Sequence, residues 1–378
     1  MNILFLDQFS DLGGAQQCLL DLAPAIQMRG WKMICAAPGN GRLVEKLRSV
    51  GVTVHSLPAG RLASGKKPAS DFVRFSLRAP RLAREISSLA RETSADLLYA
   101  NGPRVLPAAA WVARRTGRPL LFHCHNHLPQ RAAAWLAGRS LQLADARVIT
   151  CCRYAARPLW PYIDPGKLRV IYNGVAAPAI QKRKLQNGLH IGVIGRISPE
   201  KGQAEFIAAA RLLHAKFPEY KFTVFGAPLF EDPKAHAYFG RVRALAEGLP
   251  VAFPGWQDDV NAALAGLDVL VVPSLREPGA ARVVIEAYAA RVPVVAFASG
   301  GIPEILHDRE TGLLVEPPTP ENLAAKLEEI LQAPEQRCAI TATAYRAWQE
   351  QFTLERYQRE VVEVIGITQT RLATGRSI

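Results

Sequence analysis

Short runs of apolar, often β-branched residues alternate along the chain with longer segments in which apolar residues recur every three or four positions. The short runs predict buried strands and the longer segments predict amphipathic helices. Such alternation is typical of α/β proteins with parallel sheets. Strands are expected at residues 3–6, 33–36, 52–56, 97–100, 120–123, 148–150 and 170–172, then at 190–194, 222–225, 251–253, 269–272 and 294–297. Helices are expected at residues 15–28, 41–50, 72–92 and 107–115, then at 203–217, 234–247, 258–265, 282–289 and 321–332.

A polar and basic stretch without periodicity, residues 176–188, separates the two sets of elements and is the predicted linker. A chain of 378 residues also exceeds the size at which a single hydrophobic core stops growing. We therefore predict two similar α/β domains, at residues 1–183 and 188–345. Ligands are expected at the carboxyl ends of their strands.

The remaining segment, residues 346–378, has a mostly helical pattern. It carries Trp348, Phe352 and Tyr357, which are too few large side chains to form a core. Left in solvent, these aromatic side chains would form an exposed apolar patch. We therefore expect this segment to pack on another domain.

The net charge of +13 is concentrated in the first half of the chain. Residues 1–185 contain 27 Lys and Arg against 10 Asp and Glu, a net charge of +17, whereas residues 186–378 have a net charge of −4. The first half is therefore expected to face an anionic partner: a membrane surface, a phosphorylated lipid or nucleic acid. Nucleic acid is disfavoured, because the charge lies among helical segments without base-stacking aromatic residues or a recognition-helix pattern.

One predicted helix concentrates part of this charge. Its arginines recur at spacings of four and three, and two lysines precede it in a Gly-rich loop at residues 59–70. These residues are Lys66, Lys67, Arg74, Arg78, Arg81 and Arg84. Peripheral contact with an anionic membrane is one interpretation of this helical face, and an ordinary solvated surface is the alternative.

Nothing in the sequence predicts a membrane-spanning segment or a secretory signal. No apolar run approaches the roughly 20 residues that cross a bilayer, and the chain begins directly with the strand at residues 3–6. The six cysteines show no C-x-x-C spacing, which favours thiols in a reducing compartment. We expect a cytoplasmic location, with peripheral attachment to the inner face of the plasma membrane as an extension of it.

The first chemical motif follows the strand at residues 190–194. A glycine turn at Gly195 leads through Arg196 and Lys201 into a helix, whose first N–H groups are free to bind an anion. Arg196 can chelate phosphate oxygens and Lys201 adds a second positive charge. A departing pyrophosphate needs such charges when no metal is supplied. A solvated basic turn is the alternative.

The second motif is another strand, loop and helix, with Glu277 in the loop and Glu286 in the helix. Carboxylates in these places can accept hydrogen bonds from ribose and sugar hydroxyls. Stabilisation of the helix dipole by Glu286 is the plainer explanation. A third motif, Gly13 and Gly14 after the first strand, would let a ligand approach the backbone closely, or simply form a tight turn.

Three histidines alternate at the end of a predicted strand: His123, His125 and His127. Alternate residues of an extended strand share a face, so all three could point the same way. Collinear side chains about 6–7 Å apart cannot close on one ion without a bend, which disfavours a metal site. Contact with a sugar, or a hydrogen-bonded histidine in the core, are the interpretations that remain.

Taken together, the motifs resemble those of retaining GT-B glycosyltransferases of family 4, and the resemblance covers nearly the whole chain. In chain order the motifs are Gly13-Gly14, His125-Asn126, Asn173-Gly174-Val175, Gly195-Arg196, Glu200-Lys201-Gly202, Phe225-Gly226, Pro273-Ser274, Glu277, Glu286-Ala287, Pro293-Val294-Val295-Ala296 and Gly300-Gly301-Ile302-Pro303-Glu304. The resemblance implies two Rossmann-like domains, with the nucleotide sugar bound mainly by the second and the acceptor mainly by the first. It also implies a C-terminal helix that crosses back to the first domain, and no metal or other cofactor.

The resemblance also implies roles for individual residues. Arg196 and Lys201 would hold the diphosphate, Glu286 the ribose and Glu277 a hydroxyl of the donor sugar, while His125 would contact that sugar or the reacting centre. The catalytic residues implied are His125, Arg196, Lys201 and Glu277. The donor-binding residues implied are Gly13, Gly14, Gly195, Arg196, Lys201, Gly279, Ala280, Ala281, Val283 and Glu286.

The sequence departs from the family pattern in the loop after Glu277. Eight residues separate Glu277 from Glu286 where the family usually has seven. A Gly-Ala-Ala stretch at residues 279–281 replaces the usual aromatic-glycine pair, and Asn126 stands in place of an aspartate. The extra residue leaves the role of Glu277 open.

The function expected is transfer of a hexose from a UDP- or GDP-sugar to an acceptor sugar or glycolipid, with retention, in polysaccharide or glycolipid assembly. No pair of residues offers a covalent nucleophile with a general acid, which favours front-face transfer with the leaving phosphate helping to deprotonate the acceptor. A nucleotide-sugar epimerase on the same scaffold is the alternative enzyme.

Overall fold

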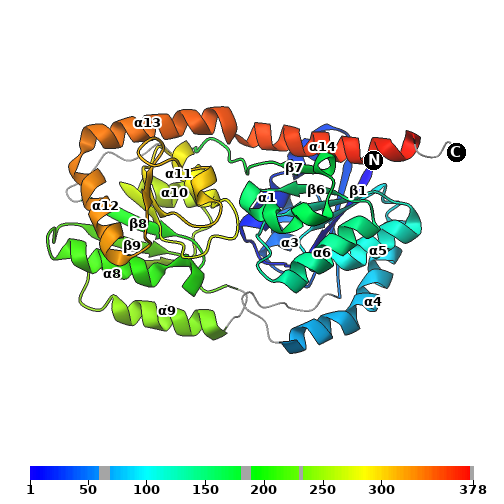
Figure 1. Cartoon of the computed structure of the whole chain (residues 1–378), viewed down its shortest axis with the longest axis horizontal. Coiled ribbons are helices and arrows are strands. Elements are labelled where there is room, and N and C mark those ends of the chain that lie inside the picture. The colour runs from blue at the N-terminus through cyan, green and yellow to red at the C-terminus, as the bar shows by residue number, and fades with distance from the viewer. Residues whose placement is uncertain (59–68, 180–188, 230–232, 375–378) are drawn as a thin grey trace. The chain divides into compact units, whose positions relative to one another are not determined.

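Buried apolar strands organise the chain into two parallel sheets, each in its own unit (Figure 1). The computed structural model describes residues 1–58, 69–179, 189–229 and 233–374. The first unit contains Met1–Tyr172 and the residues from Glu355 onward, and the second contains Asn173–Leu354. Both are α/β units with parallel strands, as the alternation of patterns predicts.

The first sheet has seven parallel strands in the order β3-β2-β1-β4-β5-β6-β7. Its strands are β1 (Asn2–Asp7), β2 (Lys32–Ala37), β3 (Thr53–Ser56), β4 (Leu97–Asn101), β5 (Leu120–Cys124), β6 (Arg147–Thr150) and β7 (Leu168–Val170). The helices of this unit are α1 (Gly14–Leu20), α2 (Ala23–Met28), α3 (Arg42–Ser49), α4 (Ala69–Glu92), α5 (Leu106–Thr116), α6 (Arg131–Leu143), α7 (Arg153–Ala156), η1 (Arg157–Tyr162), η2 (Pro165–Lys167) and α14 (Leu354–Thr374), whose first residue belongs to the second unit. The strand order reverses between β1 and β4, which is where α/β sheets bind ligands.

The second sheet has six parallel strands in the order β10-β9-β8-β11-β12-β13. Its strands are β8 (His190–Ile194), β9 (Lys221–Phe225), β10 (Val251–Gly255), β11 (Val269–Val272), β12 (Val294–Phe297) and β13 (Leu313–Val315). Its helices are η3 (Pro199–Lys201), α8 (Gln203–His214), α9 (Pro233–Leu245), α10 (Val260–Ala265), α11 (Arg282–Ala289), η4 (Ile302–Glu304), α12 (Pro320–Gln332) and α13 (Pro334–Gln351). Here the strand order reverses between β8 and β11.

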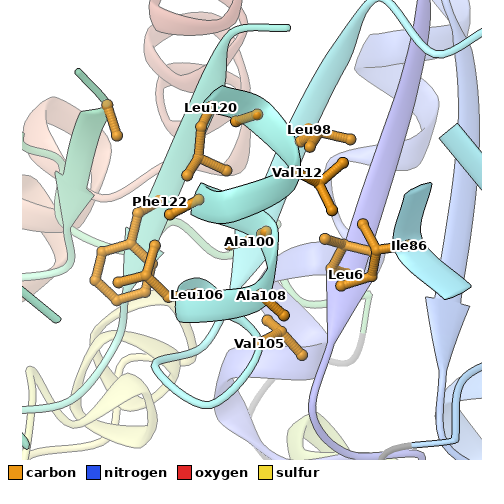
Figure 2. Close-up of a cluster of buried hydrophobic side chains, with 14 of the residues drawn as sticks. Leu6, Ile86, Leu98, Ala100, Val105, Leu106, Ala108, Val112, Leu120 and Phe122 are labelled. Atoms are coloured by element: carbon orange, nitrogen blue, oxygen red, sulfur yellow. The ribbon is translucent and has the colours of Figure 1, made fainter. Parts of the chain in front are cut away.

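The core of the first unit lies between the sheet and the helices that cover it. Figure 2 shows Leu106 and Val112 of α5 beside Leu98 of β4 and Phe122 of β5. All four side chains are fully buried. At about 25 cal/mol per Å² of apolar surface, this burial is the main stabilising contribution of the layer.

The structure corrects two sequence expectations about local elements and contains two further elements that were not expected. The helix expected at residues 15–28 is broken into α1 and α2, with Pro24 in the first turn of the second, where its missing N–H costs no hydrogen bond. The last strand of the first sheet lies at 168–170 rather than 170–172. Helix α6 and strand β13 were not predicted, because an Ala-rich helix and a three-residue strand give weak periodicity.

The unit boundaries also differ from the predicted 183, 188 and 345. Val175 bridges to Thr353, and the Trp348 indole donates to the Val175 carbonyl at 3.2 Å, so the chain from Asn173 belongs to the second unit. The predicted linker at 176–188 lies largely outside the described residues. The C-terminal segment 346–378 is divided between the units: Trp348 and Phe352 belong to the second, while the fully buried Tyr357 donates to the Cys18 carbonyl in the first.

Three glycines bring the loops at the carboxyl edge of the second sheet into backbone contact. A Cβ at Gly202, the N-cap residue of α8, would overlap the carbonyl oxygen of Pro273 after β11. Likewise, a Cβ at Gly226 would overlap Gly195 O, and one at Gly300 would overlap Glu277 O. These contacts fix the loops after four strands, β8, β9, β11 and β12, against one another.

We predict that Gly202→Ala destabilises the protein much more than Gly248→Ala. Both glycines have positive φ, +69° and +76°, so each alanine carries a left-handed backbone cost of about 1 kcal/mol. Only Gly202 faces a neighbouring backbone, whereas nothing lies within 4 Å of a Cβ at Gly248, so Gly202→Ala should cost a further ~1–3 kcal/mol. Urea unfolding followed by circular dichroism measures both. Equal losses would show that the contact with Pro273 is unimportant.

Candidate donor and sugar site

In the second unit, the loops that follow β8 and β11 bring the expected phosphate-binding residues together. Lys201, in η3 after β8, donates from Nζ to Oε2 of Glu277, in the loop after β11, at 2.6 Å. Arg196 donates from Nη2 to Glu200 Oε1 at 2.7 Å. The two cations are thus held at the reversal point of the sheet by carboxylates.

These ion pairs leave the cations within reach of a ligand. The Arg196 and Lys201 side chains are 22% and 25% exposed, whereas Glu277 is only 6% exposed. A buried carboxylate requires a partner charge, so the ion pair with Glu277 fixes the position of the Lys201 ammonium. The cations can therefore add anionic ligand oxygens without first losing their orientation.

The loop with the extra residue is held by backbone contacts. Gly300 lies against the Glu277 carbonyl, and Gly301 N donates to Gly279 O at 3.2 Å. Ala280 and Ala281 are buried, and Ala281 is the N-cap residue of α11. This loop therefore contacts the loop after β12 through backbone atoms, with small buried side chains on its own side.

Glu286 lies in the second turn of α11. Its Oε1 accepts a hydrogen bond from Arg282 Nε at 2.8 Å, and both side chains are partly buried, 16% and 15% exposed. Val283, on the first turn of the same helix, is half-buried. The pair with Arg282 leaves the other carboxylate oxygen of Glu286 available to accept hydroxyls.

Two serine hydroxyls at this edge were given no role from the sequence. Ser198 Oγ and Ser274 Oγ are buried and have no hydrogen-bond partner among the described residues. Buried polar atoms are normally paired, so unpaired ones near a candidate site mark places where a ligand or water can bind. Ser274 belongs to the Pro273-Ser274 motif and Ser198 lies two residues after Arg196, but a lone serine carries no sequence signal for ligand binding.

In the first unit, a buried network joins β1, α1 and β4 to His125. The Asp7 carboxylate, at the end of β1, accepts from Gln16 Nε2 at 3.0 Å and from Asn101 Nδ2 at 2.6 Å. Asn101 Oδ1 lies 2.8 Å from His125 Nε2. Asp7 and Asn101 are partners in the β1–β4 register, at the reversal point of this sheet. The sequence alone does not single out Asp7, Gln16 and Asn101, because strand pairing brings Asp7 to Asn101 and the packing of α1 brings Gln16 to Asp7.

The network fixes the protonation of His125. The Asn101 amide turns its NH₂ to Asp7, so its oxygen accepts a hydrogen from His125 Nε2 and leaves a lone pair on Nδ1. Burial lowers the pKa of His125 to about 3, so its imidazole is neutral at physiological pH. Burial raises the pKa of Asp7 to about 6, although its hydrogen bonds with Asn101, Phe9 and Gln16 oppose the shift.

The three histidines do not share one strand face, contrary to the expectation. Strand β5 ends at Cys124; the rings of His123 and His125 lie 3.9 Å apart, and His127 turns to the Tyr154 carbonyl. His123 is a core histidine whose Nδ1 lies 2.6 Å from the Tyr99 hydroxyl. Among the described residues, no group of three or more His, Cys, Asp or Glu could hold a metal ion.

The glycines of the first unit lie beside this network. Gly13 is the N-cap of α1, and a Cβ there would come within 3.0 Å of Gln16 Oε1. A Cβ at Gly14 would meet nothing within 4 Å. Neither glycine has a positive φ, so what glycine contributes at these positions is the space left by the missing side chain.

Part of the predicted basic face can be located on α4. Arg78, Arg81 and Arg84 are exposed, while nothing is described of the Arg74 side chain. Lys66 and Lys67 lie outside the described residues.

Two family models match the sequence, and together they cover most of the chain. The family described as Glycosyltransferase Family 4 matches residues 12–177, and the family described as Glycosyl transferases group 1 matches residues 179–347. The chain belongs to the family 4 glycosyltransferases.

Curated relatives support this family assignment. The chain is 28% identical to the sulfoquinovosyl transferase SQD2 of Arabidopsis thaliana, over 69% of this chain and 54% of the relative. It is 30% identical to the alpha-maltose-1-phosphate synthase of Mycolicibacterium smegmatis, over 49% of this chain and 52% of the relative. The chain spans about half the length of the curated relatives it matches.

Solved structures show that the fold is GT-B. HepE of Anabaena, in a crystal structure with UDP and glucose, matches with a TM-score of 0.83 at 23% identity, over 97% of this chain and 99% of HepE. The two Rossmann-like domains expected from the resemblance are therefore confirmed as the fold of this family member. In the described part of the chain, no helix is both long and apolar enough to cross a membrane.

We predict that Asp7 and His125 shift the pH dependence of stability in opposite directions. His125 stabilises the fold above its ordinary pKa of 6.5, and this contribution is lost as the pH falls towards 3. The Asp7 contribution is fully present below pH 3.8 and is lost as the pH rises through about 6. When the pH falls from 7 to 5, the free energy of unfolding of Asp7→Asn should therefore decrease more than that of the unmodified protein. The free energy of unfolding of His125→Gln should decrease less.

Urea unfolding at pH 7, 6 and 5 measures this difference. Each group can change the slope by up to about 1.4 kcal/mol per pH unit. If both variants follow the unmodified protein, the two groups do not have these pKa values.

Proposed function

We propose that this protein transfers a hexose from UDP-hexose to an acceptor with retention of anomeric configuration. The observation that carries the proposal is the placement of Arg196 and Lys201 after β8, and of Glu277 and Glu286 after β11, the two neighbouring strands at which the order of the second sheet reverses. Two cations beside carboxylates match a diphosphate joined to hydroxyl-bearing sugars. UDP is favoured over GDP because the structurally similar HepE has been crystallised with UDP and UDP-glucose.

The diphosphate is proposed to bind the exposed sides of Arg196 and Lys201. Both cations are fixed before the ligand arrives, so they stabilise the negative charge that develops on the leaving phosphate without reorganising. Glu286 accepts hydrogen bonds from the ribose hydroxyls, and Glu277 positions Lys201 through their ion pair. Because these cations supply the charge that a metal would supply, the reaction is proposed to be metal-independent.

In the proposed reaction, the bond from the anomeric carbon to the β-phosphate oxygen breaks and a bond to the acceptor oxygen forms on the same face of the sugar. The acceptor hydroxyl proton passes to the departing phosphate, and UDP leaves. Neutral His125 accepts a hydrogen bond from a sugar hydroxyl at its free Nδ1. The acceptor proposed is a sugar or glycolipid of polysaccharide or glycolipid assembly.

We predict that Arg196→Ala and Lys201→Ala each lower kcat/KM by about 100-fold or more, the usual effect of removing one group that stabilises transition-state charge. Release of UDP from UDP-hexose with an acceptor present, in EDTA, is the measurement. Lys216→Ala is the control, because Lys216 is an exposed lysine of the same unit that pairs with Glu328. It should react at the unmodified rate.

Unchanged kcat/KM in both site variants, with UDP- and GDP-sugars alike, would refute this donor site. Loss of activity in EDTA would refute metal independence. Donor binding can be checked without an acceptor, since a ligand at 100 times its Kd raises the free energy of unfolding by about 2.7 kcal/mol.

We further propose that the protein works in the cytoplasm, in peripheral contact with the anionic inner face of the plasma membrane. The net charge of +17 in residues 1–185 supports this proposal, as do the exposed Arg78, Arg81 and Arg84 on one helix. Arg81→Glu combined with Arg84→Glu should reduce sedimentation with phosphatidylglycerol vesicles at low salt, by ~1 kcal/mol per charge removed. If vesicles do not sediment the unmodified protein, the contact does not exist.

A further inference from the structure

A pocket of about 730 Å³ opens on the first unit beside the loop that carries His125. It is formed by the chain after β5, by the first turns of α6 and by η1, which follows α7 and β6. His127, one of its lining residues, stands two positions after His125. The pocket therefore lies near the carboxyl ends of β5 and β6, at the edge of the sheet where α/β units bind ligands.

One side of the pocket is apolar and aromatic. It includes Trp135, Pro158, Pro161 and Tyr162, and the Trp135 side chain is 55% exposed. A Cβ on α6 at Gly138 would overlap the Tyr162 ring, so the absence of a side chain there lets η1 pack directly on the helix. The aromatic wall is thus fixed by backbone packing and presents an indole to solvent.

The other side of the pocket carries positive charges that no carboxylate in the described part of the chain neutralises. Arg131 and Arg157 both line the pocket and are exposed, and the described residues give neither an ion-pair partner. Residues 97–144 contain six arginines and no Lys, Asp or Glu. This stretch therefore has no carboxylate that could form an ion pair with Arg131.

The Arg157 guanidinium is also oriented. It lies 5.8 Å from the centre of the Tyr154 ring, whose plane stacks on His127 at 4.3 Å and 20°. His127 is in turn anchored through Nδ1 to the Tyr154 carbonyl at 2.9 Å. A guanidinium held by such a stack retains its hydrogen-bond donors for a ligand phosphate.

We propose that this pocket binds the acceptor, and that the acceptor is an amphipathic anion: a phosphate ester carried on an apolar chain. The phosphate binds Arg131 and Arg157, and the chain lies on Trp135 and the prolines. The volume suits one such ligand, because ligand pockets measure roughly 300–1,000 Å³. The assignment as acceptor rests on the proposed function, whereas the chemistry of the ligand rests on the pocket alone.

Octyl phosphate tests the chemistry, because it joins both features in a soluble monomer. Isothermal titration calorimetry should show binding at least ~10-fold tighter than that of inorganic phosphate or octanol, since each of these engages one side only. The double variant Arg131→Ala, Arg157→Ala and the single variant Trp135→Ala should each weaken octyl phosphate binding by about 10-fold or more. Trp111→Ala is the matched control: it removes an exposed indole from α5, outside this pocket, and should bind normally.

Two results would overturn the proposal. One is octyl phosphate binding that is absent, or equal in all variants. The other is loss of binding to phosphatidylglycerol vesicles in the double variant without any binding of monomeric octyl phosphate, which would make this face a membrane contact. A thermal shift with UDP, run on every variant, separates this proposal from the donor site: it should be unchanged by the pocket variants and lost in Arg196→Ala.

Discussion

The pairing of β8 with β11 in the second sheet is the constraint on which the donor site depends. These strands are neighbours in the sheet but are separated in the chain by β9 and β10. Because all strands are parallel, the loops that follow β8 and β11 leave the same edge of the sheet, at the point where the strand order reverses. Arg196 and Lys201 come from one loop and Glu277 from the other. The same rule operates in the first sheet, where β1 and β4 bring Asp7 to Asn101.

Backbone contact then makes the donor edge rigid. Gly202, Gly226 and Gly300 each occupy a position where any side chain would overlap a neighbouring carbonyl. Protein interiors tolerate little overpacking, so these positions admit glycine alone. The loop with the additional residue is held next to Lys201 in the same way, because Gly300 lies against the Glu277 carbonyl and Gly301 N donates to Gly279 O.

The two units hold their polar groups by different means. The donor edge pairs cations with carboxylates and leaves the cations partly exposed, so charge is kept near solvent at a moderate desolvation cost. The first unit buries a hydrogen-bonded chain from Asp7 to His125, in which burial keeps the imidazole neutral. The first arrangement suits an anionic ligand and the second suits hydroxyls. In the pocket of the first unit, Arg131 and Arg157 are exposed and no carboxylate of the described residues forms an ion pair with them, which suits a phosphate.

The sequence by itself determined the alternation of strands and helices, the two α/β domains, and the basic and acidic residues of the donor motifs. Each of these is a local signal, either a periodicity or a motif of fixed spacing, and local signals can be read from the sequence without a structure. The unit boundaries, the break near Pro24 and strand β13 could not be read, because they depend on weak periodicity or on contacts such as Trp348 with Val175. Only the tertiary structure decided that Asp7, Gln16 and Asn101 form the hydrogen-bond network that ends at His125, and that Glu277 pairs with Lys201. These partners are up to 94 positions apart in the chain, and strand order, which no local pattern encodes, brings them together.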